Sequence, residues 1–218
     1  MSIRHSLSGM VLQILSAINI IIMLRHISFI LLFLFSLVIT VKAQELRVVN
    51  RGMVKDSAIH LNEAPGVGIA WITNSNFSNG TIEFDIKGKN LLQKSFVGIA
   101  FHGVNDTTYD AIYFRPFNFQ VPEAGRRGHS VQYISLPGHD WQELRTNFPG
   151  KYENEIDPST NPNKWFHVKV VVAYPEVSVY VNEKRCLTVS QLSTQKTGMI
   201  GYWVGYGSSG DWKNLKIE

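Results

Sequence analysis

The residues best suited to chemistry lie along one expected hairpin. Two runs rich in β-branched and aromatic residues, Phe96–His102 and Tyr109–Phe114, flank a short polar segment of the kind that joins antiparallel strands. Strand side chains alternate between the two faces of a sheet, so one face is apolar and the other carries His102, Tyr113 and Arg115 among small residues. This mixture suits a shallow polar groove better than a second core.

Further polar and aromatic residues follow the hairpin. The run His129–Tyr133 supplies Gln132 or Tyr133 on a neighbouring strand, and the next loop supplies Trp141 and Arg145. Sugars are bound by aromatic faces and by polar side chains that both donate and accept hydrogen bonds. The residue types therefore indicate a carbohydrate site, in which Trp141 is either a platform for a sugar ring or a plug at the end of the fold.

The segments that must position these residues are expected to be strands. Apolar or alternating runs recur between turn-forming clusters after Ala43, and no long stretch has helical periodicity. The runs are Leu46–Val49, Ala58–Leu61, Val67–Ile72, Thr81–Lys87, Phe96–His102, Tyr109–Phe114, Ser130–Ser135, Phe166–Ala173, Val177–Asn182, Leu187–Val189, Gly198–Val204 and Trp212–Ile217. One short helix is expected at Trp141–Thr146, where Asp140 and Glu143 form a weak capping box. The pattern predicts an antiparallel β-sandwich or barrel in one domain, residues 44–218.

The N-terminal segment predicts export. Residues 1–43 contain no acidic residue and hold two apolar runs, the second of which ends in a small-residue exit at Ala43, typical of a signal peptide. We expect cleavage after Ala43, with Met23 as an alternative translation start, and a secreted or periplasmic mature chain. The alternative is an uncleaved N-terminal membrane anchor, since about 20 apolar residues can span a bilayer.

Charge and cysteine content narrow the class of partner. Of the 21 basic residues, Arg4, Arg25 and Lys42 lie in that segment, so 18 remain against 17 acidic residues. This balance gives no argument for nucleic acid, and none for a stable membrane association once the signal is cleaved. Cys186 is the only cysteine, which excludes an internal disulfide and favours a buried apolar role over a reactive thiol.

Motifs spread over residues 44–218 resemble the concanavalin A-like lectin and glucanase jelly roll. They are a strand led by Trp165, a Val-Tyr-Val-Asn strand end at Val179–Asn182, a Gly-x-Ile-Gly strand at Gly198–Gly201 and a last strand at Asp211–Ile217. The resemblance extends to laminin-G-like domains, family 16 glucanases and 3-keto-disaccharide hydrolases. It implies an all-β concanavalin A-like jelly-roll β-sandwich of two antiparallel sheets with its ligand on the concave face, although fold does not fix function.

Two carboxylates offer a test of glucanase chemistry. The family 16 motif, Glu-x-Asp-x-x-Glu, uses its outer glutamates as nucleophile and acid/base, and a retaining mechanism needs carboxyl groups about 5 Å apart. Glu83 and Asp85 match the first two acids of this motif, but Gly88 replaces the last one. Catalytic roles for Glu83 and Asp85 therefore compete with an ordinary solvent-facing row, and standard family 16 catalysis is not expected.

The resemblance to 3-keto-disaccharide hydrolases implies a different reaction. Loss of the proton beside the keto group lets the glycosidic oxygen leave, which requires one base and one oxyanion stabiliser. In that case His102 or a groove carboxylate serves as the base and Arg115 as the stabiliser. The alternative for Arg115 is a structural ion pair with Glu83 or Asp85.

Other chemistries lack their motifs. The sequence has no Gly-x-Ser-x-Gly elbow, no His-Glu-x-x-His, no paired Cys-x-x-Cys and no phosphate-binding loop. Asp106, Asp110 and Asp211 are candidate ligands of a structural calcium ion, with plain turn formation as the alternative. The sequence predicts an exported protein that recognises an oligosaccharide, polysaccharide or disaccharide. It acts either as a hydrolase or lyase of glycosidic bonds or as a non-catalytic, lectin-like or laminin-G-like module for glycan or protein.

Overall fold

The structure, a computed structural model, describes residues 19–20, 22–26 and 45–218. Met1–Ala43 and Gln44–Glu218 are two separate units. The expected signal peptide and its cleavage site lie outside the described residues, apart from helical residues at 19–20 and 22–26. Within the described ranges, no helix has the length and apolar character needed to cross a membrane.

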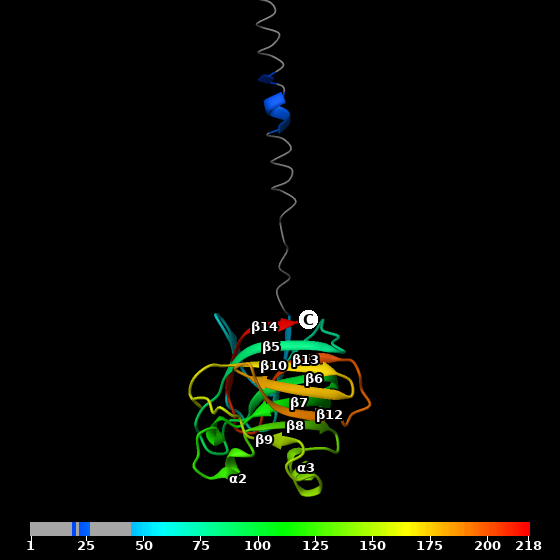
Figure 1. Cartoon of the computed structure of the whole chain (residues 1–218). Coiled ribbons are helices and arrows are strands. Elements are labelled where there is room, and N and C mark those ends of the chain that lie inside the picture. Colours follow the sequence, from blue (N-terminus) through cyan, green and yellow to red (C-terminus); the bar gives the residue numbers. More distant parts are fainter. Residues whose placement is uncertain (1–18, 21, 27–44) are drawn as a thin grey trace, which may run out of the picture. The chain divides into compact units, whose positions relative to one another are not determined.

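The unit Gln44–Glu218 is a sandwich of two antiparallel sheets, each with seven strands in the described part of the chain (Figure 1). Sheet A consists, in spatial order, of β1 (Leu46–Val49), β4 (Gly68–Ile72), β13 (Met199–Val204), β6 (Val97–Asn105), β7 (Thr108–Phe114), β8 (Val131–Leu136) and β9 (Glu153–Asn154). Sheet B consists of β12 (Lys184–Ser190), β11 (Glu176–Val181), β10 (Phe166–Ala173), β5 (Gly80–Lys87), β14 (Gly210–Ile217), β3 (Ile59–Leu61) and β2 (Met53–Lys55). In the described part of this unit the helices are the 3₁₀ helix η1 (Pro116–Asn118), α2 (Ala124–Arg127) and α3 (Trp141–Asn147).

The predicted all-β sandwich of two antiparallel sheets is confirmed, and so is the short helix. Asp140 caps α3, because its Oδ1 accepts hydrogen bonds from the backbone N–H groups of Gln142 and Glu143, each at 2.8 Å. The prediction missed β2 and β9, which have three and two residues. A run of two or three residues is too short to show the alternation of apolar and polar residues that identifies a strand.

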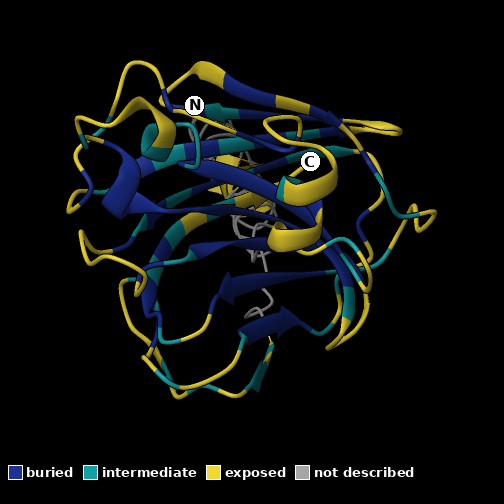
Figure 2. Cartoon of the chain, turned by 90° about the horizontal axis from the view of Figure 1, so that it is seen from below, coloured by how far each residue is buried: buried dark blue, intermediate teal, exposed yellow. Residues whose placement is uncertain are grey.

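The core lies between the two sheets, and alternation decides which residues enter it. In β10, Phe166 and the alternate valines are buried while the residues between them are partly exposed. Phe114 of sheet A packs edge-to-face on Phe166 of sheet B with ring centroids 5.3 Å apart. We call the faces that meet here the inner faces and the opposite ones the outer faces. Figure 2 shows the buried residues along the strands and the exposed ones mainly in the loops. Each fully buried aromatic or aliphatic side chain contributes about 1.5–3 kcal/mol to stability.

Candidate functional site

The polar residues singled out in the sequence separate onto the two faces of sheet A. Asp110 is paired with Phe101 of the core, so it lies on the inner face, where Tyr133 donates a hydrogen bond to it. Tyr113 is paired with Gln132 on the outer face. Two distinct polar clusters result, one inside the sandwich and one outside it.

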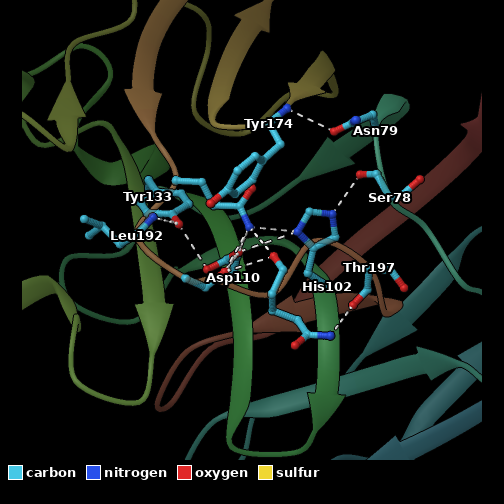
Figure 3. Close-up of polar contacts among 11 residues, drawn as sticks. Ser78, Asn79, His102, Asp110, Tyr133, Tyr174, Leu192 and Thr197 are labelled. Carbon is cyan, nitrogen blue, oxygen red and sulfur yellow. Dashed lines mark hydrogen bonds and ion pairs between the residues drawn. The ribbon is translucent and has the colours of Figure 1, made fainter.

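The inner residues form the Asp110 network, which consists of Asp110, His102, Tyr133, Gln191 and Ser193 (Figure 3). Asp110 is fully buried and accepts hydrogen bonds from Tyr133 Oη at 3.0 Å and from Gln191 Nε2 and Ser193 Oγ, each at 2.8 Å. Burial, together with the charge of Asp110, raises the pKa of Tyr133, which therefore stays a neutral donor. A buried carboxylate is tolerated only with such partners, so this network is a structural feature of the core.

His102 belongs to this network, which corrects the predicted orientation of its side chain. Strict alternation places it on the outer face with Tyr113, but the β6–β7 register shifts after Phe101, and His102 has a φ of 50°. This bulge turns the imidazole inward, where Nε2 donates to the Ser78 carbonyl at 2.7 Å and Nδ1 accepts from Gln191 Nε2 at 3.0 Å. Since a carbonyl can only accept, Nε2 carries the proton. His102 has no exposed surface, so it does not reach a sugar in this structure.

The outer residues surround one carboxylate and form the Glu153 cluster, which consists of Glu153, Arg145, His129, Arg115, Tyr113 and Gln132. Arg145 binds the Glu153 carboxylate through Nε at 2.9 Å and Nη2 at 2.6 Å. Burial alone raises the pKa of Glu153, but the hydrogen bonds and charge of Arg145, with the charges of His129 and Arg115, outweigh it and hold that pKa below its ordinary value. Glu153 is therefore ionised at neutral pH.

Arg115 is the buried cation of the cluster and contacts four of its residues. Its Nη2 donates to Tyr113 Oη at 2.6 Å and to Gln132 Oε1 at 3.1 Å, and its Nη1 donates to the His129 carbonyl at 2.9 Å. Nη1 also lies 3.8 Å from Glu153 Oε2. Burial lowers the pKa of Arg115, yet a guanidinium remains charged at neutral pH. With its donors used in this way, Arg115 positions its neighbours.

A ligand can reach the Glu153 cluster through His129 and Arg145, its partly exposed rim. About a third of the His129 and Arg145 side chains is exposed, at 34% and 33%, whereas only 3% of the Glu153 side chain is. His129 Nδ1 is buried 2.8 Å from Glu153 Oε2, at an angle outside hydrogen-bonding geometry, so Nε2 is the ring nitrogen left to meet a ligand. Trp141, at the start of α3, is 46% exposed, and the Arg145 guanidinium lies 5.2 Å from the centre of its ring. An accessible imidazole, guanidinium and indole thus lie together.

Aromatic rings fill the centre of the outer face of sheet A. Tyr113 and Trp203 pack with ring centroids 4.9 Å apart, and Trp71 packs edge-to-face on Tyr109 at 5.8 Å. Between them Gly98 leaves room, since a Cβ there would lie 2.6 Å from Tyr113 Cα. All four rings are buried. The predicted shallow polar groove along the hairpin is therefore wrong for the centre of this face, whereas His129 at the rim is accessible.

Glu83 and Asp85 lie in β5 of sheet B, apart from the Glu153 cluster. Glu83 forms an ion pair with Lys169 at 3.0 Å, and Asp85 contacts His167 Nδ1 at 3.0 Å. Both carboxylates are about a quarter exposed, at 26% and 23%. They form the solvent-facing row that the sequence offered as the alternative to catalysis. The alternative of an ion pair between Arg115 and either of them is wrong, because Arg115 lies beside the Glu153 carboxylate of β9 instead.

Each of the three candidate calcium ligands contacts a different set of residues. Asp106 accepts two hydrogen bonds from Arg47, Asp110 lies in its own network, and Asp211 contacts His60 at 2.7 Å. Across the described ranges, no group of three His, Cys, Asp or Glu side chains is placed to hold a metal ion. The structure therefore offers no calcium site at these aspartates.

Two members of the Glu153 cluster were not among the predicted catalytic or binding residues. From the sequence, Glu153 was expected only to lie in a loop, and His129 only to precede the expected strand Ser130–Ser135. What joins them is β9, which brings Glu153 opposite Gln132 in the register. The one available sequence signal was their occurrence in polar segments that follow the hairpin.

Comparison with known proteins agrees with this architecture. A family model described as the 3-keto-alpha-glucoside-1,2-lyase-like domain matches residues 39–218. The carbohydrate-binding module CBM66 from Bacillus subtilis has a TM-score of 0.61 at 13% identity, with 79% of this chain and 94% of that chain covered. The Bacillus licheniformis β-glucanase has a TM-score of 0.51 at 13% identity, with 77% and 81% covered. The VIP36 exoplasmic/lumenal domain, in a form bound to Ca²⁺ and Man3GlcNAc, has a TM-score of 0.55 at 11% identity, with 79% and 84% covered. No curated protein matches the chain. The predicted concanavalin A-like jelly roll is confirmed.

Proposed function

The chain belongs to the family of 3-keto-alpha-glucoside-1,2-lyase-like domains, and on that premise we propose that it cleaves the glycosidic bond of a 3-keto-glucoside by elimination at the Glu153 cluster. One observation carries this proposal: an accessible imidazole and an accessible guanidinium are held against a single buried carboxylate. The jelly-roll fold shared with a carbohydrate-binding module and a β-glucanase supports a carbohydrate substrate.

The reaction requires one base and one group that stabilises an oxyanion. A keto group at C3 makes the hydrogen on C2 acidic, because the resulting enolate spreads its charge onto the keto oxygen. The base takes the C2 proton, the C1–O bond breaks and the electron pair forms a C1–C2 double bond. The leaving oxygen takes up one proton, so the products are an unsaturated keto sugar and an alcohol, without any net oxidation or reduction.

The exposed rim of the cluster supplies both groups. His129 Nε2 is the proposed base, and the Glu153 carboxylate behind Nδ1 stabilises the imidazolium that forms. Arg145 uses Nε and Nη2 on Glu153, so Nη1 is the donor available to the enolate oxygen. Trp141, nearly half exposed beside Arg145, offers an aromatic face for the sugar ring.

A non-catalytic carbohydrate-binding module is the second candidate. The observation that favours it is the saturation of Arg115, Tyr113 and Gln132 by one another, which leaves the buried part of the cluster rigid. A rigid aromatic and polar rim is sufficient for binding without turnover. Saturable binding of a 3-keto-glucoside with no product would favour this candidate.

Export is part of the proposal. Its support is the signal-like segment that ends at Ala43. We expect N-terminal sequencing of the exported protein to begin at Gln44. Residues upstream of Gln44 in the exported protein would favour the membrane-anchor alternative.

The test uses the purified chain with p-nitrophenyl 3-keto-α-glucoside as substrate and unmodified p-nitrophenyl α-glucoside as the substrate control. We expect nitrophenol release from the keto substrate alone, and a loss of kcat of about 10²–10⁴-fold in His129→Gln, as is usual when a general base is removed. His167→Gln is the matched control, because His167 is similarly exposed and lies 3.0 Å from a carboxylate of its own on sheet B. Equal activity in both variants would exclude His129 as the base.

A further inference from the structure

A separate feature lies at the edge of the sandwich, where β9 of sheet A contacts β12 of sheet B (Figure 1). Asn154 Nδ2 donates a hydrogen bond to the Cys186 carbonyl at 2.9 Å and ties the two edges together. Beside this link is a pocket of about 290 Å³, lined by residues from 150–154 and 185–188. We call it the edge pocket.

Two cations line the edge pocket without a carboxylate partner. Within the described part of the chain, neither Lys151 nor Arg185 forms an ion pair. Lys151 Nζ lies 5.5 Å from the ring centres of Phe148 and Tyr152, which restricts the ammonium without neutralising it. Both cations are therefore available to a ligand.

The one acidic residue that lines the pocket does not cancel this charge. Glu153 is already neutralised by the two hydrogen bonds from Arg145 and by its contacts with His129 and Arg115. The uncompensated charge around the edge pocket is thus positive. Both cations are exposed, so added salt should weaken their attraction for an anion.

Neutral groups complete the lining. The Thr188 hydroxyl already pairs with the Ser178 hydroxyl at 3.0 Å, and Asn154 Nδ2 with the Cys186 carbonyl. A lone pair of Thr188 Oγ1 and the Asn154 carbonyl oxygen remain for hydrogen bonds to a sugar. Cys186 also borders the pocket, but its side chain is buried and its thiol donates a hydrogen bond to the Val179 carbonyl at 3.5 Å, so it presents no charged group to a ligand. The volume, about 290 Å³, lies just below the range for small-molecule sites, about 300–1,000 Å³, and fits one sugar ring better than a long chain.

From this geometry we infer that the edge pocket binds an anionic saccharide unit, one that carries a carboxylate or a sulfate. Arg185 and Lys151 hold the anionic group, while Thr188 and Asn154 face the hydroxyl groups of the ring. The inference goes beyond the proposed elimination and does not depend on it, since it requires only binding. Glu153 lines the pocket and also centres the catalytic cluster, so an acidic unit bound here lies next to the proposed active site.

The test is calorimetric titration of the purified chain with methyl β-D-glucuronide, methyl β-D-glucoside and sodium sulfate. We expect the glucuronide to bind at least tenfold more tightly than the glucoside, and added salt to weaken its binding. Arg185→Gln and Lys151→Gln should each weaken glucuronide binding about tenfold, as loss of a charge-assisted hydrogen bond does. Lys184→Gln is the matched control, because Lys184 is an exposed cation of the same strand that does not line the pocket; it should change affinity less than twofold.

Three results would overturn the inference. Equal affinity for glucuronide and glucoside would show that the cations do not recognise an anion. Equal weakening by Lys184→Gln would reduce the effect to general surface charge. Sulfate that binds as tightly as the glucuronide would show a free-anion site and contradict saccharide recognition. Because binding is measured without turnover, inactivity toward the keto substrate would refute the elimination and leave this result standing.

Discussion

Replacement of Glu153 by glutamine tests the physical basis of the Glu153 cluster. Glutamine keeps the length and one carbonyl acceptor of the side chain but removes its negative charge. Arg115, whose side chain is 6% exposed, would then lie in the interior without a carboxylate nearby. Arg145 would lose its two-point contact, although its exposed third can regain water.

The expected loss of stability follows from that burial. Removal of one partner from a buried ion pair costs about 3–5 kcal/mol. Since Arg145 and His129 are partly exposed, we expect the lower end, about 3 kcal/mol in the free energy of unfolding. For a domain of this size each kcal/mol lowers Tm by about 2–4 °C, so Tm should fall by roughly 6–12 °C.

The contribution of Glu153 to stability should decrease at acidic pH. The pKa of Glu153 in the folded protein lies below that of an unfolded glutamate, about 4.3. Its contribution to stability is therefore fully present above about pH 4.3 and is lost as the pH falls through the folded pKa. The difference in unfolding free energy between wild type and Glu153→Gln should be full at pH 7, shrink as the pH falls below about 4.3 and close only below the folded pKa of Glu153.

Urea denaturation followed by tryptophan fluorescence at both pH values measures this difference. Glu83→Gln is the matched control, because Glu83 forms a partly exposed ion pair with Lys169 and should cost less than about 1 kcal/mol. A loss below about 1 kcal/mol in Glu153→Gln, or a loss of the same size at pH 7 and pH 3, would refute this electrostatic reasoning.

Three further predictions concern the core. Asp110→Ala leaves the Tyr133 and Gln191 donors without their carboxylate acceptor, so urea denaturation should show a loss of about 3 kcal/mol; unchanged stability would contradict the network. Gly198→Ala places a Cβ 2.6 Å from the His102 carbonyl carbon at a φ of 156°, and its stability should fall by at least about 2 kcal/mol; a wild-type Tm would show that the bulge is packed differently. The Cys186 thiol, with its pKa raised by burial to about 12, should react with a disulfide reagent at pH 8 only in urea; rapid reaction in native buffer would contradict its burial.

The fold could be predicted because it follows from local patterns, namely the alternation of apolar and polar residues in strands and the turn-forming residues between them. The strand from Phe166 to Ala173 matches its prediction at both ends, since Val168, Val170 and Val172 face the core in strict alternation. The cap at Asp140 likewise needs only its own neighbours along the chain.

The candidate site could not be predicted to the same degree because it depends on non-local geometry. The orientation of His102 is reversed by a bulge that breaks strict alternation, and Gly198, far along the chain, lies against that bulge. The partner of Arg115 is set by β9, a strand of two residues whose register with β8 no local pattern indicates. Residue types singled out Arg115, Tyr113 and Gln132, which the structure brings together, but not the carboxylate beside which they lie.

Breakage of the C2–H bond is the measurement closest to the proposed elimination. The substrate is p-nitrophenyl 3-keto-α-glucoside with deuterium at C2, incubated with the purified chain, and the sugar product is analysed for deuterium as soon as nitrophenol is released. We expect slower release than from the protiated substrate, and a product that has lost the C2 deuterium and carries a C1–C2 double bond. A saturated product that keeps its C2 deuterium, released at the same rate, would show direct hydrolysis and contradict elimination at His129.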